Sequence, residues 1–574
     1  MLLLLAGTSL QAQWKSGLWT EKQAYNWYFG VAAGIEFNSS PPVGVADSAI
    51  EADLSNPYDG SVSTFIEGTG SISDAQGNLL FYTNGVTVWN ANHEIMENGE
   101  GLLGNSSSTQ SGLIVPAPNN PNIFYLFSVN GSILQTSEAT FIADGVFYSE
   151  IDMSLDGNMG AVTVNKNVPL SSDVAEKITA VHHANGQDVW VIIQNSAGDE
   201  FKAFLVSETG VNTTPVVSDG GVYIVSSDVG AIKASPDGNK IAAARPYFGA
   251  YVVEVFDFNR ETGEISEILA TLNNTDFTGE LLGCYGIEFS PNSRFLYAST
   301  MFTGRVYQFD VTAGSEQEIK DSGNIIGQLS DDINYSMQLA PDGKIYIAHG
   351  DFFSGPFEPY LGSQSTLNVI NFPNNEGLAS GFAEDAVDLL DGRNDVSLPS
   401  FIQSYFASGI IYEGQCDGES FSFSTLRIPG ISEISWDFGD PDSGNNISTD
   451  LEPAHIFSAP GTYTVTAVIT SNGVQQTATK EVIVFPAPDA VIPPLNELMQ
   501  CANAAGEGTF NLTALNTTIL NGQNPDEHTV IYYATSEDME AGNAIPVPGE
   551  FITAGQVIYA VVTNIVNGCT STIQ

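Results

Sequence analysis

Basic residues are scarce in this chain. Its 574 residues include 16 lysines and arginines against 67 aspartates and glutamates, a formal net charge of -51 at pH 7. A surface this acidic repels phosphate backbones and anionic lipid headgroups, so nucleic acid and acidic membranes are excluded as partners. Acidic loops of this kind can hold Ca²⁺, so a structural calcium ion stays open, but no other cofactor is indicated.

Cysteine and histidine are scarce as well. The 4 cysteines are far apart with no Cys-x-x-Cys pair, and the 6 histidines form no His-x-His or His-Glu-x-x-His motif. Zinc and dithiol redox chemistry are therefore not predicted. Cys501 and Cys569 bracket the last segment, so we predict a disulfide between them. We expect Cys284 and Cys416 to be free and buried.

Long apolar runs are absent, because no window approaches the roughly 18 residues that a membrane-spanning helix needs. Residues 1–13, "MLLLLAGTSLQAQ", are instead typical of a secretory signal remnant. Leu2–Ala6 forms its apolar core, and Leu10-Gln11-Ala12 offers a small-residue cleavage site. We therefore predict a secreted or cell-surface protein that reaches its location by a signal peptide and has no membrane span.

Helical periodicity is nearly absent, and short apolar runs broken by Gly, Asn, Asp and Pro predict an all-β protein. A turn followed by an alternating strand recurs in "HANGQDVWVII", "SPDGNKIAAA", "SPNSRFLYAS" and "APDGKIYIAH", which begin at residues 183, 235, 290 and 340. Asp-Gly and Asn-Gly pairs supply the positive φ angles of tight hairpins. Repeated antiparallel units of this spacing predict a β-propeller over residues 24–405, and we favour seven blades over six.

This region resembles the WD-repeat-like propeller of secreted Bacteroidetes surface proteins. The resemblance rests on "NWYFGVAAGIEFNSSPP", "LLFYTNGVTVWNANHEIMENG", "EKITAVHHANGQDVWVI", "YGIEFSPNSRFLY" and "LPSFIQSYF", in that order. It implies export by the type IX secretion system, whose machinery would recognise a C-terminal sorting domain. No such domain is visible before Gln574.

Residues 410–486 resemble a PKD domain, an immunoglobulin-like β-sandwich, through "WDFGD" and "PAHIFSAPGTYTVTAV". In 462–470 the residues Tyr463, Val465, Ala467 and Ile469 share one face of a strand. Asp437, Asp440 and Asp442 offer at most three ligands, too few for calcium, so we interpret them as turn residues that hydrogen-bond backbone.

A proline-rich linker, "FPAPDAVIPP", separates this domain from residues 495–574, which again read as alternating strands. They resemble a small immunoglobulin-like β-sandwich that follows PKD domains in the same secreted proteins. We expect this second sandwich to be truncated at its C-terminus, with the sorting region beyond it.

Catalytic motifs are absent: there is no Gly-x-Ser-x-Gly, P-loop or dinucleotide fingerprint, and His182 and His183 would point to opposite faces of one strand. The best binding candidates are aromatic residues in the expected blade loops, because loops on rigid scaffolds carry recognition. They would contact a ligand or, equally, pack on neighbouring blades; they are Tyr247, Phe248, Phe352, Phe353 and Tyr360.

These observations favour an adhesin-like interaction protein rather than an enzyme. The propeller would bind an extracellular glycan or protein, and the two sandwich domains would act as spacers. Two alternatives stay open, namely a propeller hydrolase or lactonase and a component of the secretion or gliding apparatus.

Overall fold

The computed structural model describes residues 21–39, 41–51, 66–118, 120–131, 145–221, 229–245, 252–273, 283–300, 303–329, 332–351, 364–406, 410–425, 431–471, 474–565 and 567–574. The chain divides into two compact units, Met1–Ala407 and Ser408–Gln574. Regular structure in both is mainly β-strand, as the sequence predicts.

The first unit is a β-propeller in which the strands of each blade are hydrogen-bonded in antiparallel order. A nine-stranded sheet joins the second and third blades through the short strand β29 (Leu398–Ser400). The strands of the first three blades are β1 (Asn26–Phe29), β2 (Ala33–Glu36) and β3 (Val43–Val45); β4 (Gly68–Ser73), β5 (Leu79–Thr83) and β6 (Val88–Asn90); and β7 (Gly112–Pro116), β8 (Ile123–Asn130), β9 (Gly145–Asp152), β10 (Ala161–Val162) and β11 (Val168–Ser171).

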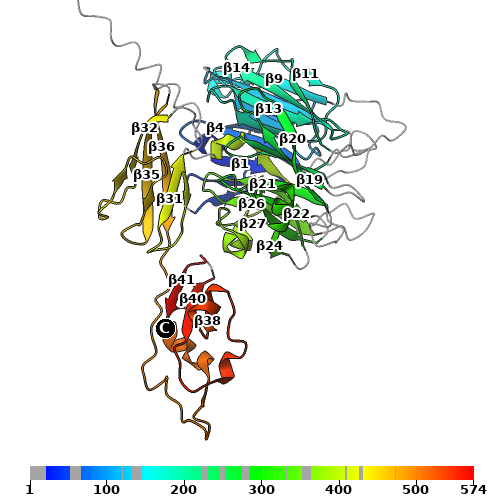
Figure 1. Ribbon diagram of the computed structural model, residues 1–574. Helices are drawn as coiled ribbons and strands as arrows, with labels where there is room; N and C mark the ends of the chain where they lie inside the picture. The colour runs from blue at the N-terminus through cyan, green and yellow to red at the C-terminus, as the bar shows by residue number, and fades with distance from the viewer. Residues whose placement is uncertain are drawn as a thin grey trace, which may run out of the picture. The chain divides into compact units, whose positions relative to one another are not determined.

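Four further blades complete the ring, so the described residues form seven blades, the favoured count. In Figure 1 these blades follow one another in colour from cyan, at β13 and β14, to yellow-green, near β26 and β27. Their strands are β12 (Ile178–His182), β13 (Val189–Gln194), β14 (Glu200–Ser207), β15 (Gly210–Val211) and β16 (Val216–Asp219); β17 (Ile232–Ala234), β18 (Lys240–Arg245), β19 (Val252–Phe258) and β20 (Ile265–Asn273); β21 (Cys284–Phe289), β22 (Phe295–Thr300), β23 (Arg305–Asp310) and β24 (Asn324–Gln328); and β25 (Asp332–Leu339), β26 (Ile345–Asp351), β27 (Thr366–Ile370) and β28 (Phe382–Asp388).

The repeated turns form hairpins between the first and second strand of a blade. In the turn before β18, Gly238 has φ +73° and Asp237 Oδ1 accepts the Asn239 amide at 3.0 Å. In the turn before β26, Gly343 has φ +78° and its amide donates to the Ala340 carbonyl at 3.0 Å. The glycines are required because an L side chain is strained in this left-handed conformation.

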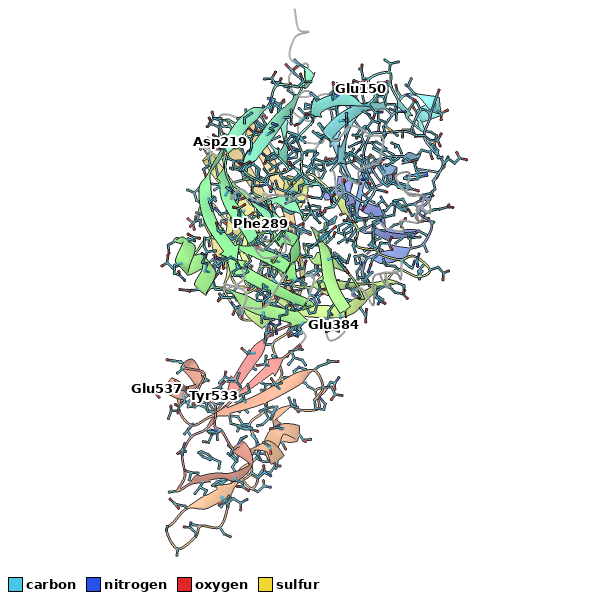
Figure 2. All side chains as sticks on the ribbon, turned by 90° about the vertical axis from the view of Figure 1, so that its right-hand side faces the viewer. Glu150, Asp219, Phe289, Glu384, Tyr533 and Glu537 are labelled. Atoms are coloured by element: carbon cyan, nitrogen blue, oxygen red, sulfur yellow. A yellow bond between two sulfur atoms is a disulfide. The ribbon has the colours of Figure 1, made fainter. Side chains whose placement is uncertain are left out.

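Short helices occur at a few blade connections, and the apolar core lies between the blades. Phe289 is fully buried in the sheets, whereas Glu150 and Glu384 lie at the periphery of the propeller (Figure 2). The helices of this unit are η1 (Glu21–Ala24), η2 (Asp156–Asn158), α2 (Glu316–Asp321), η3 (Gly377–Ser380) and η4 (Gln403–Phe406).

The two ends of the propeller sequence meet to close the ring. Val31, after β1, and Arg393, before β29, form an antiparallel bridge. The Trp27 ring lies 5.7 Å from the Phe401 ring, so β1 and the segment after β29 also share core. Ring closure therefore uses residues more than 360 positions apart, because the bridge joins residues 31 and 393.

The PKD segment of the second unit is a two-sheet sandwich, as predicted. Val465, Ala467 and Ile469 are buried from one strand, together with Trp436 and Phe438. One sheet contains β30 (Ile410–Glu413), β31 (Phe421–Thr425) and β34 (Ala454–His455), and the other contains β33 (Ile447–Ser448), β32 (Ile431–Asp437), β35 (Gly461–Ser471) and β36 (Val474–Val484).

Two aspartates of "WDFGDPD", Asp437 and Asp440, hydrogen-bond backbone amides, which confirms their interpretation. Asp437 Oδ1 accepts the Gly439 amide at 2.9 Å, and Asp440 Oδ2 accepts the Ser458 amide at 2.8 Å. Asp440 also faces His455, whose Nε2 lies 3.1 Å away, while Asp442 is exposed. These carboxylates therefore fix loops of the sandwich.

The C-terminal segment has small sheets and short helices in place of a full complement of sandwich strands. Tyr533 and Glu537 mark it in Figure 2. Its core gathers Leu512, Ile519, Tyr532 and Val562. The elements are β37 (Gly508–Phe510) paired with β39 (Phe551–Thr553); β38 (His528–Tyr533), β40 (Tyr559–Asn564) and β41 (Thr570–Ile573); and η5 (Leu512–Leu515), α3 (Asn516–Ile519), α4 (Ser536–Glu540) and η6 (Pro548–Glu550).

The predicted disulfide between Cys501 and Cys569 is wrong. Cys569 bonds instead to Cys416, with Cα atoms 5.6 Å apart, and Cys501 is exposed and free. The predicted free state of Cys416 is therefore also wrong, whereas Cys284 is free and buried as expected. The reason lies in the tertiary structure. Cys416 forms a β-bridge with Phe485 at the end of the PKD domain, and the neighbouring Gln415 side chain donates to the Asn567 carbonyl, which brings Cys416 close to Cys569.

Candidate functional site

One end of the propeller channel collects polar side chains. β29 pairs in parallel with β4 and β7, and Ile402 bridges Ala180 of β12 in parallel, so these innermost strands start at the same end. We call this end the channel mouth and define it by residues at or just before the innermost strands, namely Glu67, Ser107, Thr109, Glu176 and Tyr285.

Glu67 connects blades across the mouth. It precedes β4, and its carboxylate accepts the Tyr285 hydroxyl of β21 at 2.7 Å and the Ser107 hydroxyl at 3.1 Å. Burial raises the pKa of the Glu67 carboxyl to about 7, although both hydrogen bonds act in the opposite direction. Glu67 is only partly buried, so a carboxyl that titrates near neutrality faces the mouth.

Glu176 forms a second acceptor beside it. Its carboxylate accepts the Thr109 amide at 3.1 Å and the Thr109 hydroxyl at 3.3 Å, and the Gly230 amide donates to the same hydroxyl at 3.1 Å. Burial, followed by the charge of Glu67, raises the pKa of the Tyr285 hydroxyl well above its ordinary value. Tyr285 therefore stays a hydrogen-bond donor at physiological pH.

The channel below the mouth is occupied by the chain itself. β29 contacts β1, β4, β7 and β25, and η4 continues to β12 and β17. The Ser404 hydroxyl lies 2.7 Å from His182 Nδ1, and burial lowers the pKa of His182 to about 3, so this imidazole is neutral. His183 instead faces the Glu261 carbonyl, so the two histidines diverge as predicted.

A buried ion pair lies deeper among the innermost strands. Lys233 Nζ of β17 is 2.9 Å from Glu288 of β21, and both side chains are almost fully buried. Burial lowers the pKa of Lys233 and raises that of Glu288, whereas their mutual attraction opposes both shifts. This pair joins two blades and lies away from solvent, so it serves the scaffold.

Thr109, Glu176 and Tyr285 are buried and hold the ring together, whereas Glu67 and Ser107 are partly exposed. A hydroxyl-rich or cationic group at the mouth would therefore meet the Glu67 carboxylate and the Ser107 hydroxyl. Glu67 could also transfer a proton near pH 7. Among the described residues, no three His, Cys, Asp or Glu side chains come close enough together to hold a metal ion. None of the helices in the described ranges is long and apolar enough to cross a membrane.

The predicted aromatic contacts lie outside the described residues. They are Tyr247, Phe248, Phe352, Phe353 and Tyr360, from segments that connect β18 to β19 and β26 to β27. Sequence reasoning missed the mouth residues. Glu176 and Tyr285 begin two of the segments that resemble the propeller family, but those segments indicated only blade strands, and Glu67 belongs to no motif. The one available signal was their place at or beside the start of innermost strands.

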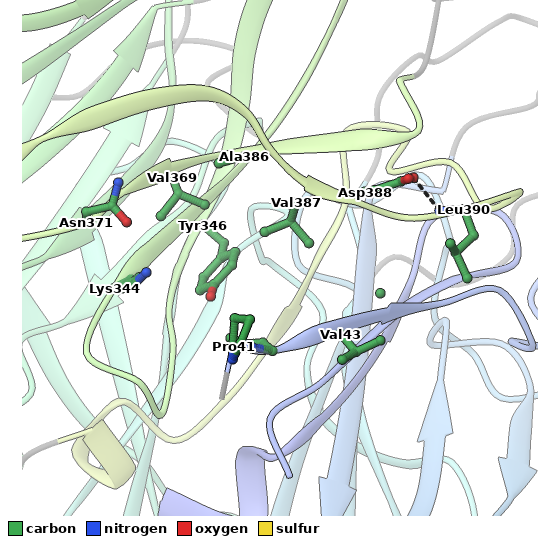
Figure 3. Close-up of a pocket in the computed structure, with 12 residues that line it drawn as sticks. Pro41, Val43, Lys344, Tyr346, Val369, Asn371, Ala386, Val387, Asp388 and Leu390 are labelled. Atoms are coloured by element: carbon green, nitrogen blue, oxygen red, sulfur yellow. Dashed lines mark hydrogen bonds between the residues drawn. The ribbon is translucent and has the colours of Figure 1, made fainter. Parts of the chain in front are cut away.

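A separate cleft of about 370 Å³ lies between the last blade and the first (Figure 3). Pro41 and Val43 line one side, and Tyr346, Val369 and Val387 line the other. A Cβ added to Gly44 would meet the Asp388 carbonyl oxygen at 2.0 Å, so the two blades touch at one end of the cleft.

The second unit matches two known domain families. Residues 412–484 match the PKD domain, and residues 497–574 match the Flavobacterium inter-domain disulphide bond domain. The Cys416–Cys569 disulfide joins these two matched segments, which fits the description of the second family. Together the modules and the formed disulfide indicate an extracellular protein.

No curated protein sequence matches the chain. Among solved structures, a putative 6-phosphogluconolactonase from Bacteroides uniformis is 13% identical, covering 73% of this chain and 98% of its own with a TM-score of 0.33. The β-propeller domain of Cps50 from Myceliophteria thermophila is 11% identical, covering 57% and 94%, with a TM-score of 0.31.

The PKD1 domain of Vibrio anguillarum Epp is 27% identical and covers 13% of this chain and 92% of its own, with a TM-score of 0.12. The propeller assignment itself rests on strand topology. In this chain a propeller therefore precedes a segment that matches the PKD domain and a segment that matches the Flavobacterium inter-domain disulphide bond domain.

Proposed function

We propose that this chain is an exported interaction protein whose propeller binds a hydroxyl-rich extracellular ligand, a glycan, at the channel mouth. The observation that carries the proposal is the ring of acceptors and donors around Glu67 and Tyr285, fixed by hydrogen bonds between blades. Paired carboxylate and hydroxyl groups suit sugar hydroxyls, each of which both donates and accepts. The PKD and C-terminal domains would act as spacers.

Binding of the full chain to an array of extracellular polysaccharide fragments tests this proposal. Tyr285→Phe removes the donor to Glu67 but keeps the ring, and we expect it to weaken glycan binding at least tenfold. Glu264→Gln, at an exposed site beside β20, is the matched control and should leave binding unchanged. Absence of any glycan binding by the folded chain would refute the proposal.

A hydrolase or lactonase is the second candidate, favoured by one observation, the pKa of Glu67 near 7. A general acid or base works best when its pKa lies near the operating pH. Turnover of a glycoside or lactone that is lost in Glu67→Gln would support this candidate over simple binding.

Export through residues 1–13 and the type IX system is part of the same proposal. The net charge of -51 and the extracellular character of the modules support it. The mature protein collected from culture medium should begin at Gln13, which N-terminal sequencing measures. A mature chain that retains Met1, or that stays in the cytoplasm, would contradict export.

A further inference from the structure

The cleft between the last and first blades reaches the edge of a strand. β28 is the outermost strand of its sheet, and in the part of the chain that the structure describes no strand pairs with its other side. The consecutive residues Ala386, Val387 and Asp388 all line the cleft. Neighbouring side chains of a strand point to opposite faces of the sheet. Three consecutive residues therefore line the same cleft because the cleft reaches the backbone edge of the strand.

Hydrogen bonding shows which amides face outward. The Leu389 amide donates to the Ser365 carbonyl at 2.7 Å, on the side of β27, and Val387 lies opposite Leu367 in the register. The register shifts at a bulge beyond Val387, but the Asp385 amide also turns to the side of β27 and donates to Asn368 Oδ1 at 2.9 Å. The amides of Ala386 and Asp388, which lie between these inward-facing ones, therefore face away from β27. Gly44 of the first blade packs against the backbone of Asp388 and covers the strand edge there. Ala386 is exposed, so the strand edge is accessible at this residue.

The floor of the cleft is mainly apolar, and Lys344 and Asn371 also line it. Val387 lies opposite Leu367, and Val369, two residues further along β27, shares that face; Tyr346, opposite Val369, continues the face inward. Pro41 and Val43 of the first blade lie opposite, as Figure 3 shows. An added strand at β28 would direct every second side chain into this floor.

The other face of β28 is acidic. Glu384 is exposed and follows Ala383, which pairs with Val369 on the cleft face, so the Glu384 side chain lies on the other face of the sheet. The chain itself carries 67 acidic residues and only 16 basic ones, so a second copy would meet this edge with like charge. Charge complementarity selects a basic segment from another protein.

We propose that β28 accepts an extended segment of a partner protein, in which apolar and basic residues alternate, as an added antiparallel or parallel strand. The apolar side chains enter the floor formed by Val43, Val369 and Val387, and the basic side chains lie beside Glu384. Backbone hydrogen bonds to β28 supply the affinity. The apolar cleft selects partner segments in which every second residue is apolar. This surface is separate from the channel mouth, so the inference does not depend on the glycan proposal.

Fluorescence anisotropy of the full chain tests the inference. The probe is a fluorescein-labelled heptapeptide, Lys-Val-Lys-Val-Lys-Val-Lys, at roughly physiological salt, where distant surface charges are screened. A second probe has the same sequence with N-methylated valines, which keeps the charge and removes backbone donors. We expect the first probe to bind and the second to bind at least tenfold more weakly.

Two protein variants with the same charge change locate the site. Glu384→Lys should weaken binding of the first probe at least fivefold, whereas Asp219→Lys, at an exposed position on β16 of another blade, should change it less than twofold (Figure 2). Equal binding of the two probes, equal effects of Glu384→Lys and Asp219→Lys, or no binding of the first probe would each overturn the proposal.

Discussion

At the scale of single residues, function and stability depend on where a carboxylate lies rather than on how many there are. Most of the 67 acidic residues of this chain keep it charged. Among those that hydrogen bonds hold in place are Glu67 at the channel mouth and Asp440 in the PKD sandwich. Burial dominates at Glu67 and hydrogen bonding at Asp440, so their pKa values move in opposite directions.

Glu67 predicts a pH dependence of propeller stability. The pKa of this carboxyl rises from 4.5 when unfolded to about 7 when folded, so the folded state binds more protons between these values. Stability therefore falls as pH rises from about 4.5 to 7. Glu67→Gln should remove this loss and raise stability at pH 8 by about 1 to 2 kcal/mol, after allowance for partial exposure. Thermal unfolding of the parent protein and of Glu67→Gln at pH 5 and pH 8 measures this effect. The same loss of stability between pH 5 and pH 8 in both proteins would contradict the prediction.

Asp440 predicts the opposite dependence for the PKD domain. Burial by itself would raise the pKa of Asp440, but hydrogen bonds from Ser458 and His455 outweigh it, so the pKa is lowered. The stability that this carboxylate contributes is present above its unfolded pKa and is lost as pH falls through its folded pKa. Asp440→Asn should cost about 2 kcal/mol at pH 7 and much less under strongly acid conditions. Denaturant unfolding checks this, with the exposed Asp442→Asn as a control of no effect.

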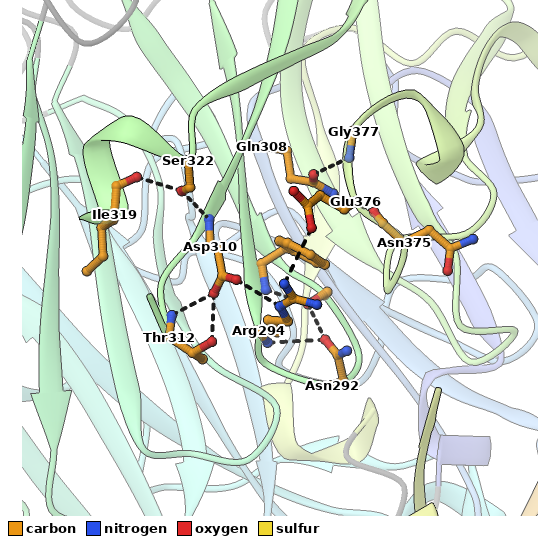
Figure 4. Close-up of polar contacts among 12 residues, drawn as sticks. Asn292, Arg294, Gln308, Asp310, Thr312, Ile319, Ser322, Asn375, Glu376 and Gly377 are labelled. Atoms are coloured by element: carbon orange, nitrogen blue, oxygen red, sulfur yellow. Dashed lines mark hydrogen bonds and ion pairs between the residues drawn. The ribbon is translucent and has the colours of Figure 1, made fainter. Parts of the chain in front are cut away.

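At the scale of elements, the blades are joined by side chains that reach between sheets. Figure 4 shows such a junction between β23 and the turn before η3. The Gln308 amide nitrogen donates to the Asn375 carbonyl at 2.7 Å, and its oxygen accepts the Gly377 amide at 2.7 Å. Arg294 also crosses to this turn, with Glu376 at 3.5 Å, but its side chain is 37% exposed.

This contrast predicts unequal effects on stability. Gln308 is buried, and Gln308→Leu removes its hydrogen bonds to the half-buried Asn375 carbonyl and Gly377 amide, which should cost about 2 kcal/mol. Arg294→Ala breaks the exposed pair with Glu376 and the pair with Asp310 at 2.8 Å, both made by a side chain that is 37% exposed, and should cost about 1 kcal/mol. Chemical denaturation of the full chain compares them, and a larger loss for Arg294→Ala would show that ion pairs rather than buried amides join these blades.

At the scale of the whole molecule, covalent closure acts on the second unit. Cys416 and Cys569 are 153 residues apart, so their disulfide closes a long loop in the unfolded chain. Closing a loop of this length restricts the unfolded ensemble and stabilises the folded state. Cys501, only 68 positions from Cys569 by number, takes no part because it lies exposed before β37.

Serine variants test this arrangement. Cys416→Ser should destabilise the second unit by about 3 to 5 kcal/mol, and Cys501→Ser should leave it unchanged. Peptide mapping under non-reducing conditions should recover the 416–569 pair from the parent protein. Recovery of a 501–569 pair, or an equal loss in both variants, would contradict the structure.

The sequence by itself determined the local features of this protein. Asp-Gly turns and alternating strands specify hairpins through backbone conformation and side-chain periodicity, which act over a few residues. The seven blades, the PKD sandwich and the turn role of Asp437 could therefore be predicted.

Only the tertiary structure decided which distant residues meet. Glu67 and Tyr285 are 218 positions apart, and Val43 and Val387 come together only when the ring closes. Cys416 was chosen over Cys501 by the packing of the second unit. Such contacts depend on the closed arrangement of whole blades and domains, and no local pattern in the sequence encodes the distance between them.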